Sequence, residues 1–198
     1  MLDNAHPLMD IYRSERENEL NTFLLADAAK PGRRRSILSA LPIYTVSDGL
    51  LEEILTRHGI DGEQKEIIKK YAAAQRQRIT TVLKTEKVED EVPIFTREEL
   101  SEKPPVLELS GVFFEKDITY SVAEYEAHLN ETLAFARQNP NYVLKQNPVH
   151  TFRNLQIFIH SGQWVMVSKG KAPAIHFVIC HPKLRNAIEN FIPPVTED

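Results

Sequence analysis

The residues best suited to chemistry lie on four short apolar runs in the last quarter of the chain. Aromatic rings, cations and amides recur along these runs, a combination typical of small-molecule binding. Arg153 and Lys169 would orient an anionic or polar effector, and the aromatic rings would bury its apolar part. The candidate ligand-binding residues are Phe152, Arg153, Gln156, Phe158, Trp164, Lys169 and His176.

The seven histidines and the one cysteine show no spacing of the kind that metal sites use. Neither His-x-x-x-His nor Cys-x-x-Cys occurs, so no metal site is predicted. His160 and His176 lie on different apolar runs and could meet across a sheet; we favour two histidines held by backbone or hydroxyl groups over a metal pair. Cys180 is interpreted as a buried, inert thiol. The chain has no glycine-rich phosphate loop, and no cofactor is expected.

The apolar runs are predicted to be strands, because they are rich in valine, isoleucine and phenylalanine and are separated by turn sequences. Their ranges are 142–146, 152–160, 164–169 and 174–180. Pro182 then opens a helix over 184–191, in which Leu184, Ile188 and Phe191 share one face.

A further strand and helix precede these runs. The strand is predicted over 106–114 and the helix over 121–138, where Ser121 and Glu124 fit a capping box. The order β-α-β-β-β-β-α indicates an α+β fold in which helices pack on a mixed β-sheet. We interpret residues 106–198 as one mixed α/β domain.

The first 85 residues are predicted to form a helical hairpin or bundle. Helices are expected over 10–29, over 46–57 after a cap at Thr45 or Ser47, and over 61–84 after a cap at Asp61. Residues 86–105 are acidic and contain proline, with one helical turn near 96–100, and are interpreted as a linker. The apolar positions of 61–84 occupy more than one helix face, so we expect this helix to mediate a homodimer.

Two patterns in the helical region have alternative interpretations. Arg33-Arg34-Arg35-Ser36 would suit a phosphate grip or a phosphorylation site, but we favour a solvated loop. The helices 46–57 and 61–84 have the layout of a DNA-reading helix-turn-helix, with lysines and arginines for phosphates. Because Glu63 and Glu66 lie in the first turn of a long second helix, we favour a hairpin.

The second half of the chain contains a series of short stretches with a recognisable spacing. They are Tyr120-Ser121-Val122-Ala123-Glu124-Tyr125, His128-Leu129, Asn141-Tyr142, Phe152-Arg153-Asn154-Leu155-Gln156-Ile157 and His181-Pro182. Together they cover about 105–192 and resemble the carboxy-terminal regulatory domains of bacterial helix-turn-helix transcriptional regulators. The resemblance implies a non-catalytic module that senses an effector or holds a dimer together, with DNA bound only through a separate domain.

His181-Pro182-Lys183 matches the opening His-x-Lys of a catalytic motif, that of phospholipase D-like proteins, and the layout resembles half of their fold. That motif needs an acid to orient its histidine where this chain has Ile188, and a second copy of the motif is missing. His181 therefore lacks the partners that phosphodiester chemistry needs, and we interpret it as a helix-start residue. A small-molecule or phosphodiester hydrolase with this degenerate motif is the alternative to a regulatory module.

Charge and composition limit the classes of partner and the cellular location that the sequence allows. The formal net charge is −4, and residues 86–133 hold 13 acidic and 4 basic residues, which predicts an acidic surface that repels polyanions. No apolar run approaches the roughly 18 residues that a membrane span needs. The first residues lack the basic and apolar parts of a signal peptide. The sequence therefore predicts a cytoplasmic protein that has no membrane partner.

Overall fold

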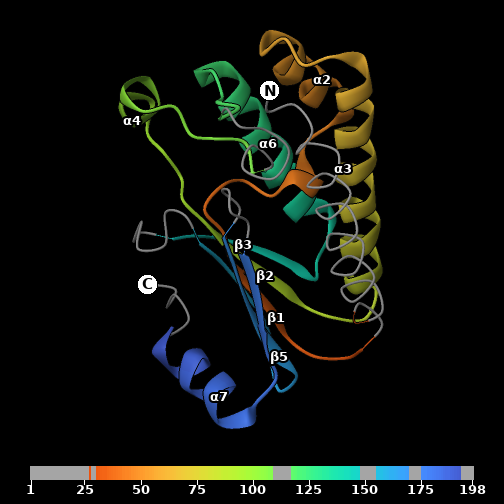
Figure 1. Cartoon of the computed structure of the whole chain (residues 1–198), viewed down its shortest axis with the longest axis vertical. Helices are drawn as coiled ribbons and strands as arrows, with labels where there is room; N and C mark the ends of the chain where they lie inside the picture. The colour runs from red at the N-terminus through yellow and green to blue at the C-terminus, as the bar shows by residue number, and fades with distance from the viewer. Residues whose placement is uncertain (1–26, 28–29, 109–116, 148–154, 170–174, 193–198) are drawn as a thin grey trace, which may run out of the picture.

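Six strands form one mixed sheet that lies between helices (Figure 1). The structure is a computed structural model that describes residue 27 and residues 30–108, 117–147, 155–169 and 175–192. The strands are β1 (Arg34–Ile37), β2 (Val88–Val92), β3 (Tyr142–Gln146), β4 (Gln156–His160), β5 (Trp164–Lys169) and β6 (Ile175–Ile179). The helices are η1 (Ile43–Thr45), α2 (Asp48–Arg57), α3 (Gly62–Val82), α4 (Arg97–Glu102), α6 (Val122–Gln138) and α7 (Pro182–Phe191).

The sheet has a parallel half and an antiparallel half, in the order β3-β2-β1-β4-β5-β6. Strand β2 pairs in parallel with both β1 and β3. The strands β4, β5 and β6 form an antiparallel meander that joins the parallel half at β1. Parallel neighbours need crossover connections, and these contain α2 and α3 between β1 and β2, and α4 and α6 between β2 and β3.

The two faces of the sheet contact different helices. We call the side that packs against η1, α3 and α6 the bundle face; there Val88 and Tyr142 pack against Tyr44 of η1. We call the opposite side the α7 face, because Ile188 of α7 packs against its apolar side chains. Side chains alternate between the faces along each strand, so the strand register assigns each residue to one face.

The helix starts agree with the capping residues in the sequence. Ser47, Asp61 and Ser121 each accept a hydrogen bond from a backbone amide in the first turn of α2, α3 and α6. Of the two caps considered for α2, Ser47 is the one used, since Thr45 belongs to η1. Thr96 and Ser121 each begin a capping box. These interactions satisfy amides that the helix itself leaves unpaired, which is why short sequence motifs identify them.

The predicted α+β class is confirmed. The prediction that the first 85 residues are wholly helical is wrong at β1, and the interpretation of 86–105 as a linker is corrected at β2. Both strands are rich in charged residues and pair with each other in the middle of the sheet, so their burial depends on tertiary pairing rather than on local propensity. The sheet therefore takes strands from all three predicted segments.

Other predicted elements lie partly beyond what the structure describes. Of the helix predicted over 10–29, only Asp27 is described. Of the strand predicted over 106–114, residues 106–108 are described, and Val106 forms an isolated bridge with Thr119. Among the described helices, none has both the length and the apolar character required to span a membrane.

Candidate functional site

The two faces of the sheet differ in chemistry over β1, β4 and β5. On the α7 face these strands carry an apolar set that packs together: Ile37, Ile157, Ile159, Val165 and Val167. On the bundle face they carry Arg34, Ser36, Gln156, Phe158, His160, Trp164, Met166 and Ser168. Buried polar groups are unfavourable unless they are paired, so a polar, covered sheet face needs an explanation. We treat this part of the bundle face, with the groups that cover it, as the candidate functional site.

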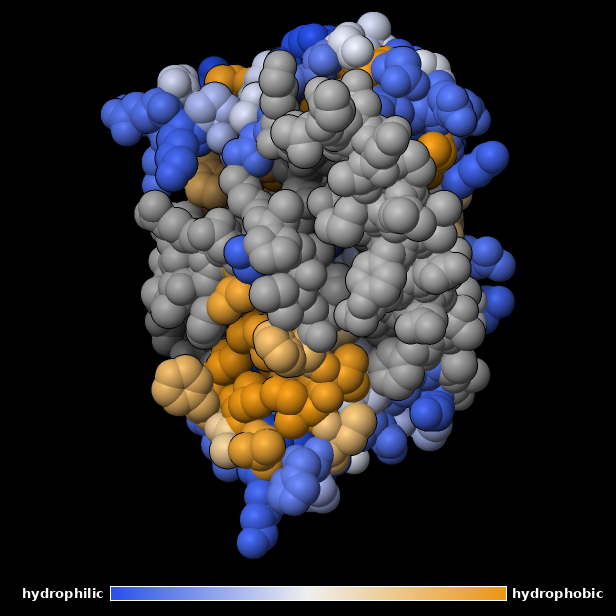
Figure 2. Space-filling view, in the orientation of Figure 1, coloured by the Kyte–Doolittle hydropathy of each residue, from blue (hydrophilic) through white to orange (hydrophobic). Residues whose placement is uncertain are grey.

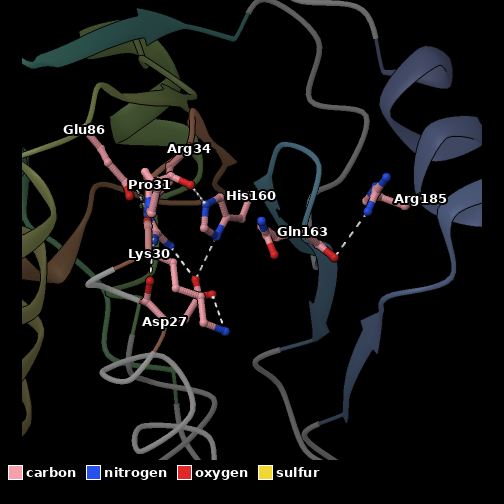
Figure 3. A network of polar contacts seen from close by, with 8 residues as sticks. All are labelled: Asp27, Lys30, Pro31, Arg34, Glu86, His160, Gln163 and Arg185. Carbon is pink, nitrogen blue, oxygen red and sulfur yellow. Dashed lines mark hydrogen bonds and ion pairs between the residues drawn. The ribbon is translucent and has the colours of Figure 1, made fainter.

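An ionic network occupies one end of the site (Figure 3). The Arg34 guanidinium donates from Nη1 to Asp27 Oδ2 at 2.7 Å and from Nε to Glu86 Oε2 at 2.5 Å. It also donates from Nη2 to the backbone oxygen of Asp27 at 2.6 Å. Both carboxylate side chains are only 1% exposed. Burial raises the pKa of Asp27, but hydrogen bonds from Arg34, Trp164 and His160 outweigh burial and hold this pKa below its ordinary value.

His160 lies in the same network and is fully buried. Its Nδ1 is 2.9 Å from Asp27 Oδ2, and its Nε2 is 3.2 Å from the backbone oxygen of Pro31. The Trp164 ring packs edge-on against the imidazole, with ring centroids 5.9 Å apart. A Cβ at Gly32 would lie 2.4 Å from Nε2, so only glycine fits there. Because both ring nitrogens face acceptors, His160 is held as a positioning group rather than as a free base.

The middle of the site is incompletely covered. Gln156 and Phe158 lie on β4, which has neighbours on both sides, yet both side chains stay partly exposed. Glu108 accepts hydrogen bonds from the Ile43 amide at 2.8 Å and from Gln156 Nε2 at 3.3 Å, and burial raises the pKa of Glu108. Arg78 of α3 interacts electrostatically with Glu108; its Nε is buried and has no hydrogen-bond partner among the described residues.

A buried carboxylic acid lies beside the ionic network. Asp90 of β2 accepts hydrogen bonds from the hydroxyl groups of Tyr44 and Tyr142, the second at 2.9 Å. Burial raises the pKa of Asp90 to about 7, although hydrogen bonds from Tyr142 and Ser36 oppose the shift. Asp90 is therefore half protonated near neutral pH.

A second buried histidine connects α6 to η1. His128 Nδ1 lies 2.8 Å from the Tyr120 hydroxyl, and its Nε2 lies 3.0 Å from Thr45 Oγ1 and 3.2 Å from the backbone oxygen of Pro42. Burial lowers the pKa of His128 to about 4, so the ring is neutral at pH 7. This arrangement joins α6 to η1.

Three of the seven predicted ligand-binding residues lie together on the bundle face. Gln156, Phe158 and Trp164 share this face, and Phe158 packs against Trp164 and Met166. Trp164 is buried, with only 5% of its surface exposed, and packs edge-on against the His160 ring. Trp164 therefore forms the floor of the site rather than its rim.

The other four predicted residues are placed differently. Phe152 and Arg153 lie outside the described residues. Lys169 is on β5 one position beyond Ser168 and belongs to the α7 face, so it does not line the same surface as Gln156. His176 pairs with Ser168 across β5 and β6, and its side chain lies outside what the structure describes.

The interpretation of Arg33-Arg34-Arg35 as a solvated loop is wrong. Arg34 belongs to the buried network, and Arg35 donates to Glu91 Oε1 at 2.5 Å and to the backbone oxygen of Ile192 at 2.6 Å. Arg33 is half exposed and pairs with Glu89 at 3.0 Å. The acidic surface predicted for 86–133 is corrected at β2, because Glu89 and Glu91 are buried against Arg33 and Arg35, and Asp90 is buried against two tyrosine hydroxyls. Complementary charges at 33–35 and 86–91 were the signal that could have identified this strand pair.

The residues that follow β6 differ from expectation at Cys180, whereas His181 is at the start of a helix, as expected. Cys180 is exposed just beyond the edge strand, so its interpretation as a buried thiol is wrong. His181 precedes α7 and is exposed, and its side chain makes no capping hydrogen bond. Ile188, at the position where a catalytic motif needs an acid, packs in the apolar cluster of the α7 face.

Among the described residues, no group of three or more histidine, cysteine or acidic side chains is arranged to hold a metal ion. Comparison of the chain with models of protein families, with curated proteins and with solved structures gives no match.

Proposed function

We propose that this chain is a non-catalytic regulatory module that binds a small effector and holds a dimer together. In this proposal it belongs to a bacterial transcriptional regulator that contacts DNA through a separate domain and acts in the cytoplasm. The observation that carries the proposal is the partial exposure of Gln156 and Phe158 in the interior of the sheet, above a buried polar floor.

The chemistry around the partly exposed Gln156 and Phe158 fits a small molecule with an acidic group and an apolar part. Phe158 and Met166 offer apolar contact, and Gln156 offers an amide whose position Glu108 fixes by a hydrogen bond. Arg78 supplies a guanidinium that interacts electrostatically with Glu108 and whose buried Nε has no hydrogen-bond partner among the described residues. Small-molecule sites combine such apolar walls with a few oriented polar groups. Arg78 thus takes the role that the sequence suggested for Lys169, and the role predicted for Arg153 stays a prediction.

The state of His160 favours binding over catalysis. A general base must present a free nitrogen to the proton that it removes. His160 directs one nitrogen to Asp27 and the other to a backbone oxygen, and its neighbours form a charge-compensated set. The network is therefore suited to fixing the floor of a binding site.

An effector should stabilise the folded chain, and this stabilisation should depend on the bundle face. We expect a thermal-shift screen of small carboxylates and phosphates to find a compound that raises Tm and alters Trp164 fluorescence, because binding only to the folded state stabilises it by about 2.7 kcal/mol at 100 times Kd. Phe158→Ala and Arg78→Met should each weaken binding about tenfold or more.

Lys169→Ala is the matched control, since Lys169 lies on the opposite face and should leave binding unchanged. A compound whose affinity depends on Lys169 and not on Phe158 would contradict this site. Hydrolysis of a phosphodiester that is lost in His181→Ala would contradict the non-catalytic assignment and favour the alternative, a hydrolase.

The chain itself should bind duplex DNA weakly and without sequence preference. Three cations of the helix pair α2 and α3 are already paired: Lys65 and Lys69 lie 2.8 and 2.6 Å from Glu52 carboxylate oxygens, and Arg76 donates to the Val46 backbone oxygen at 2.6 Å. Few cations remain for phosphates, so binding should disappear as salt rises.

Fluorescence anisotropy at low and at physiological salt measures this directly. Glu52→Gln releases two lysines and should strengthen binding at low salt alone. Nanomolar, site-specific binding by the natural chain at physiological salt would instead identify α2 and α3 as a DNA-reading unit.

A further inference from the structure

One edge of the sheet carries an exposed apolar surface that continues onto a helix. Among the described residues, the large apolar side chains that are exposed are Ile67, Phe177, Val178, Leu184 and Phe191. Phe177 and Val178 lie on β6, while Leu184 and Phe191 lie on α7, which packs over β5. Figure 2 shows apolar side chains gathered in the lower part of the molecule, where Figure 1 places α7 and β5. We call Phe177, Leu184 and Phe191 the edge surface; Val178 pairs with Met166 and so lies on the bundle face.

The edge strand lacks the charged and proline residues that commonly protect sheet edges from pairing. β6 has the sequence Ile-His-Phe-Val-Ile, without lysine, acid, proline or glycine. Its outer side lies beyond the last strand of the sheet, so its outward backbone groups face away from β5. The opposite edge, β3, differs, because Lys145 there pairs with Glu89 at 3.3 Å. Unprotected edges pair with another strand when one is available.

We propose that a second copy of this chain pairs through β6, so that the two sheets become one continuous sheet across a two-fold axis. This proposal deepens the dimerisation part of the proposed function by assigning its surface. The strand is self-complementary: antiparallel pairing centred on Phe177 places Phe177 opposite its own copy and Ile175 opposite Ile179. No charge meets another charge in this register, and a two-fold axis lets the same patch serve both copies.

The exposed residues of α7 are also compatible with this two-fold axis. Phe177 pairs with Val167, which lies on the α7 face, so Phe177 lies on the side of the sheet that carries α7. Leu184 and Phe191 are two helical turns apart and so share one side of α7. Their exposed fractions of 59% and 79% leave most of both side chains uncovered in the single chain. Antiparallel pairing brings the two α7 helices to the same face of the joined sheet, where these side chains bury each other and Phe177.

The proposal moves the dimer surface away from helix 61–84. The apolar residues Ile68, Ala72, Ile79 and Val82 of α3 are buried within the chain, and Ile67 is its one exposed large apolar side chain among the described residues. Ile67 therefore provides a matched control, because it is 50% exposed and lies on a different element.

Sedimentation equilibrium of the full chain should show a dimer at about tens of micromolar, a range suited to specific interfaces. Phe177→Asp and Phe191→Asp should each raise the dissociation constant about 30-fold, whereas Ile67→Asp should leave it unchanged. Circular dichroism confirms that each variant is folded. A monomeric natural chain would contradict both this surface and the dimerisation part of the proposed function. A dimer that Ile67→Asp disrupts and Phe177→Asp does not would contradict the edge surface alone.

Cross-linking tests the register independently of folding stability. In antiparallel pairs, opposing Cα atoms lie about 4.5 to 5.5 Å apart, which suits a disulfide. Phe177→Cys in a Cys180→Ser background should therefore give a covalent dimer on mild oxidation. Ile67→Cys in the same background should stay monomeric on a denaturing gel. The reverse result would overturn the proposal.

Discussion

Replacing Arg34 with methionine should lower the free energy of unfolding by about 3 to 5 kcal/mol, because it leaves two buried carboxylates without their shared cation. Asp27 and Glu86 are each 1% exposed and lie 2.7 and 2.5 Å from the guanidinium. Urea denaturation followed by Trp164 fluorescence measures the loss, and an unchanged m value shows that the folded state is otherwise intact.

Arg33→Met is the matched control for this prediction. Arg33 is 56% exposed, and its partner Glu89 keeps a second cation in Lys145, so the loss should stay below about 1 kcal/mol. Replacing Asp27, Arg34 and Glu86 together with asparagine, methionine and glutamine should recover much of the stability, since no unpaired charge then remains. Equal losses for Arg33→Met and Arg34→Met would show that the buried network does not hold the sheet.

Replacing Asp90 with asparagine should change how stability depends on pH. Asp90 keeps its proton in the folded chain up to about pH 7, whereas an ordinary aspartate loses it at 3.8. The folded state therefore binds more protons than the unfolded state in this window, and stability falls as pH rises through it. Asparagine keeps an oxygen for the tyrosine hydroxyls but carries no charge. The stability of Asp90→Asn relative to the natural chain should thus increase by about 4 kcal/mol between pH 4 and pH 8.

His128 makes folding stability depend on pH in the opposite direction, and its replacement is a companion test. Its pKa is lowered from 6.5 to about 4, so the unfolded state binds more protons in that window, and stability is lost as pH falls through it. The two slopes oppose each other in the natural chain. Asp90→Asn should reveal the loss of stability at acidic pH that His128 causes. His128→Gln should reveal the loss of stability toward neutral pH that Asp90 causes. Parallel pH profiles for the natural chain and Asp90→Asn would contradict the buried, protonated carboxyl.

Local sequence was sufficient to predict the elements whose ends are set by residues close by in the chain. The predicted strands 142–146 and 164–169 coincide with β3 and β5, and Asp61 caps α3 as expected. Turn sequences and capping side chains act over a few residues, so their physics is visible in the sequence. The charged strands β1 and β2 were missed, since Arg34 and Glu86 are separated by more than 50 residues and become compatible with burial only when they meet.

The candidate site was predictable only where strand alternation determines it. Gln156 and Phe158 are two positions apart and share a face, as predicted. Lys169 is five positions from Trp164, an odd spacing that places them on opposite faces, and alternation alone could have excluded Lys169. Arg78 and Asp27 come from the helical half of the chain. No pattern within β4 or β5 could identify them, because Arg78 reaches the sheet from the crossover helix α3 and Asp27 lies before β1 in the chain.

Fusing the whole chain to a DNA-binding domain that represses transcription only as a dimer tests the regulatory assignment most directly. The fusion should repress a reporter gene, Ile67→Asp should retain repression, and Phe177→Asp should lose it at the same protein level. Repression no stronger than that of the DNA-binding domain alone, with the fusion folded and equally abundant, would contradict the assignment of this chain as a dimerising regulatory module.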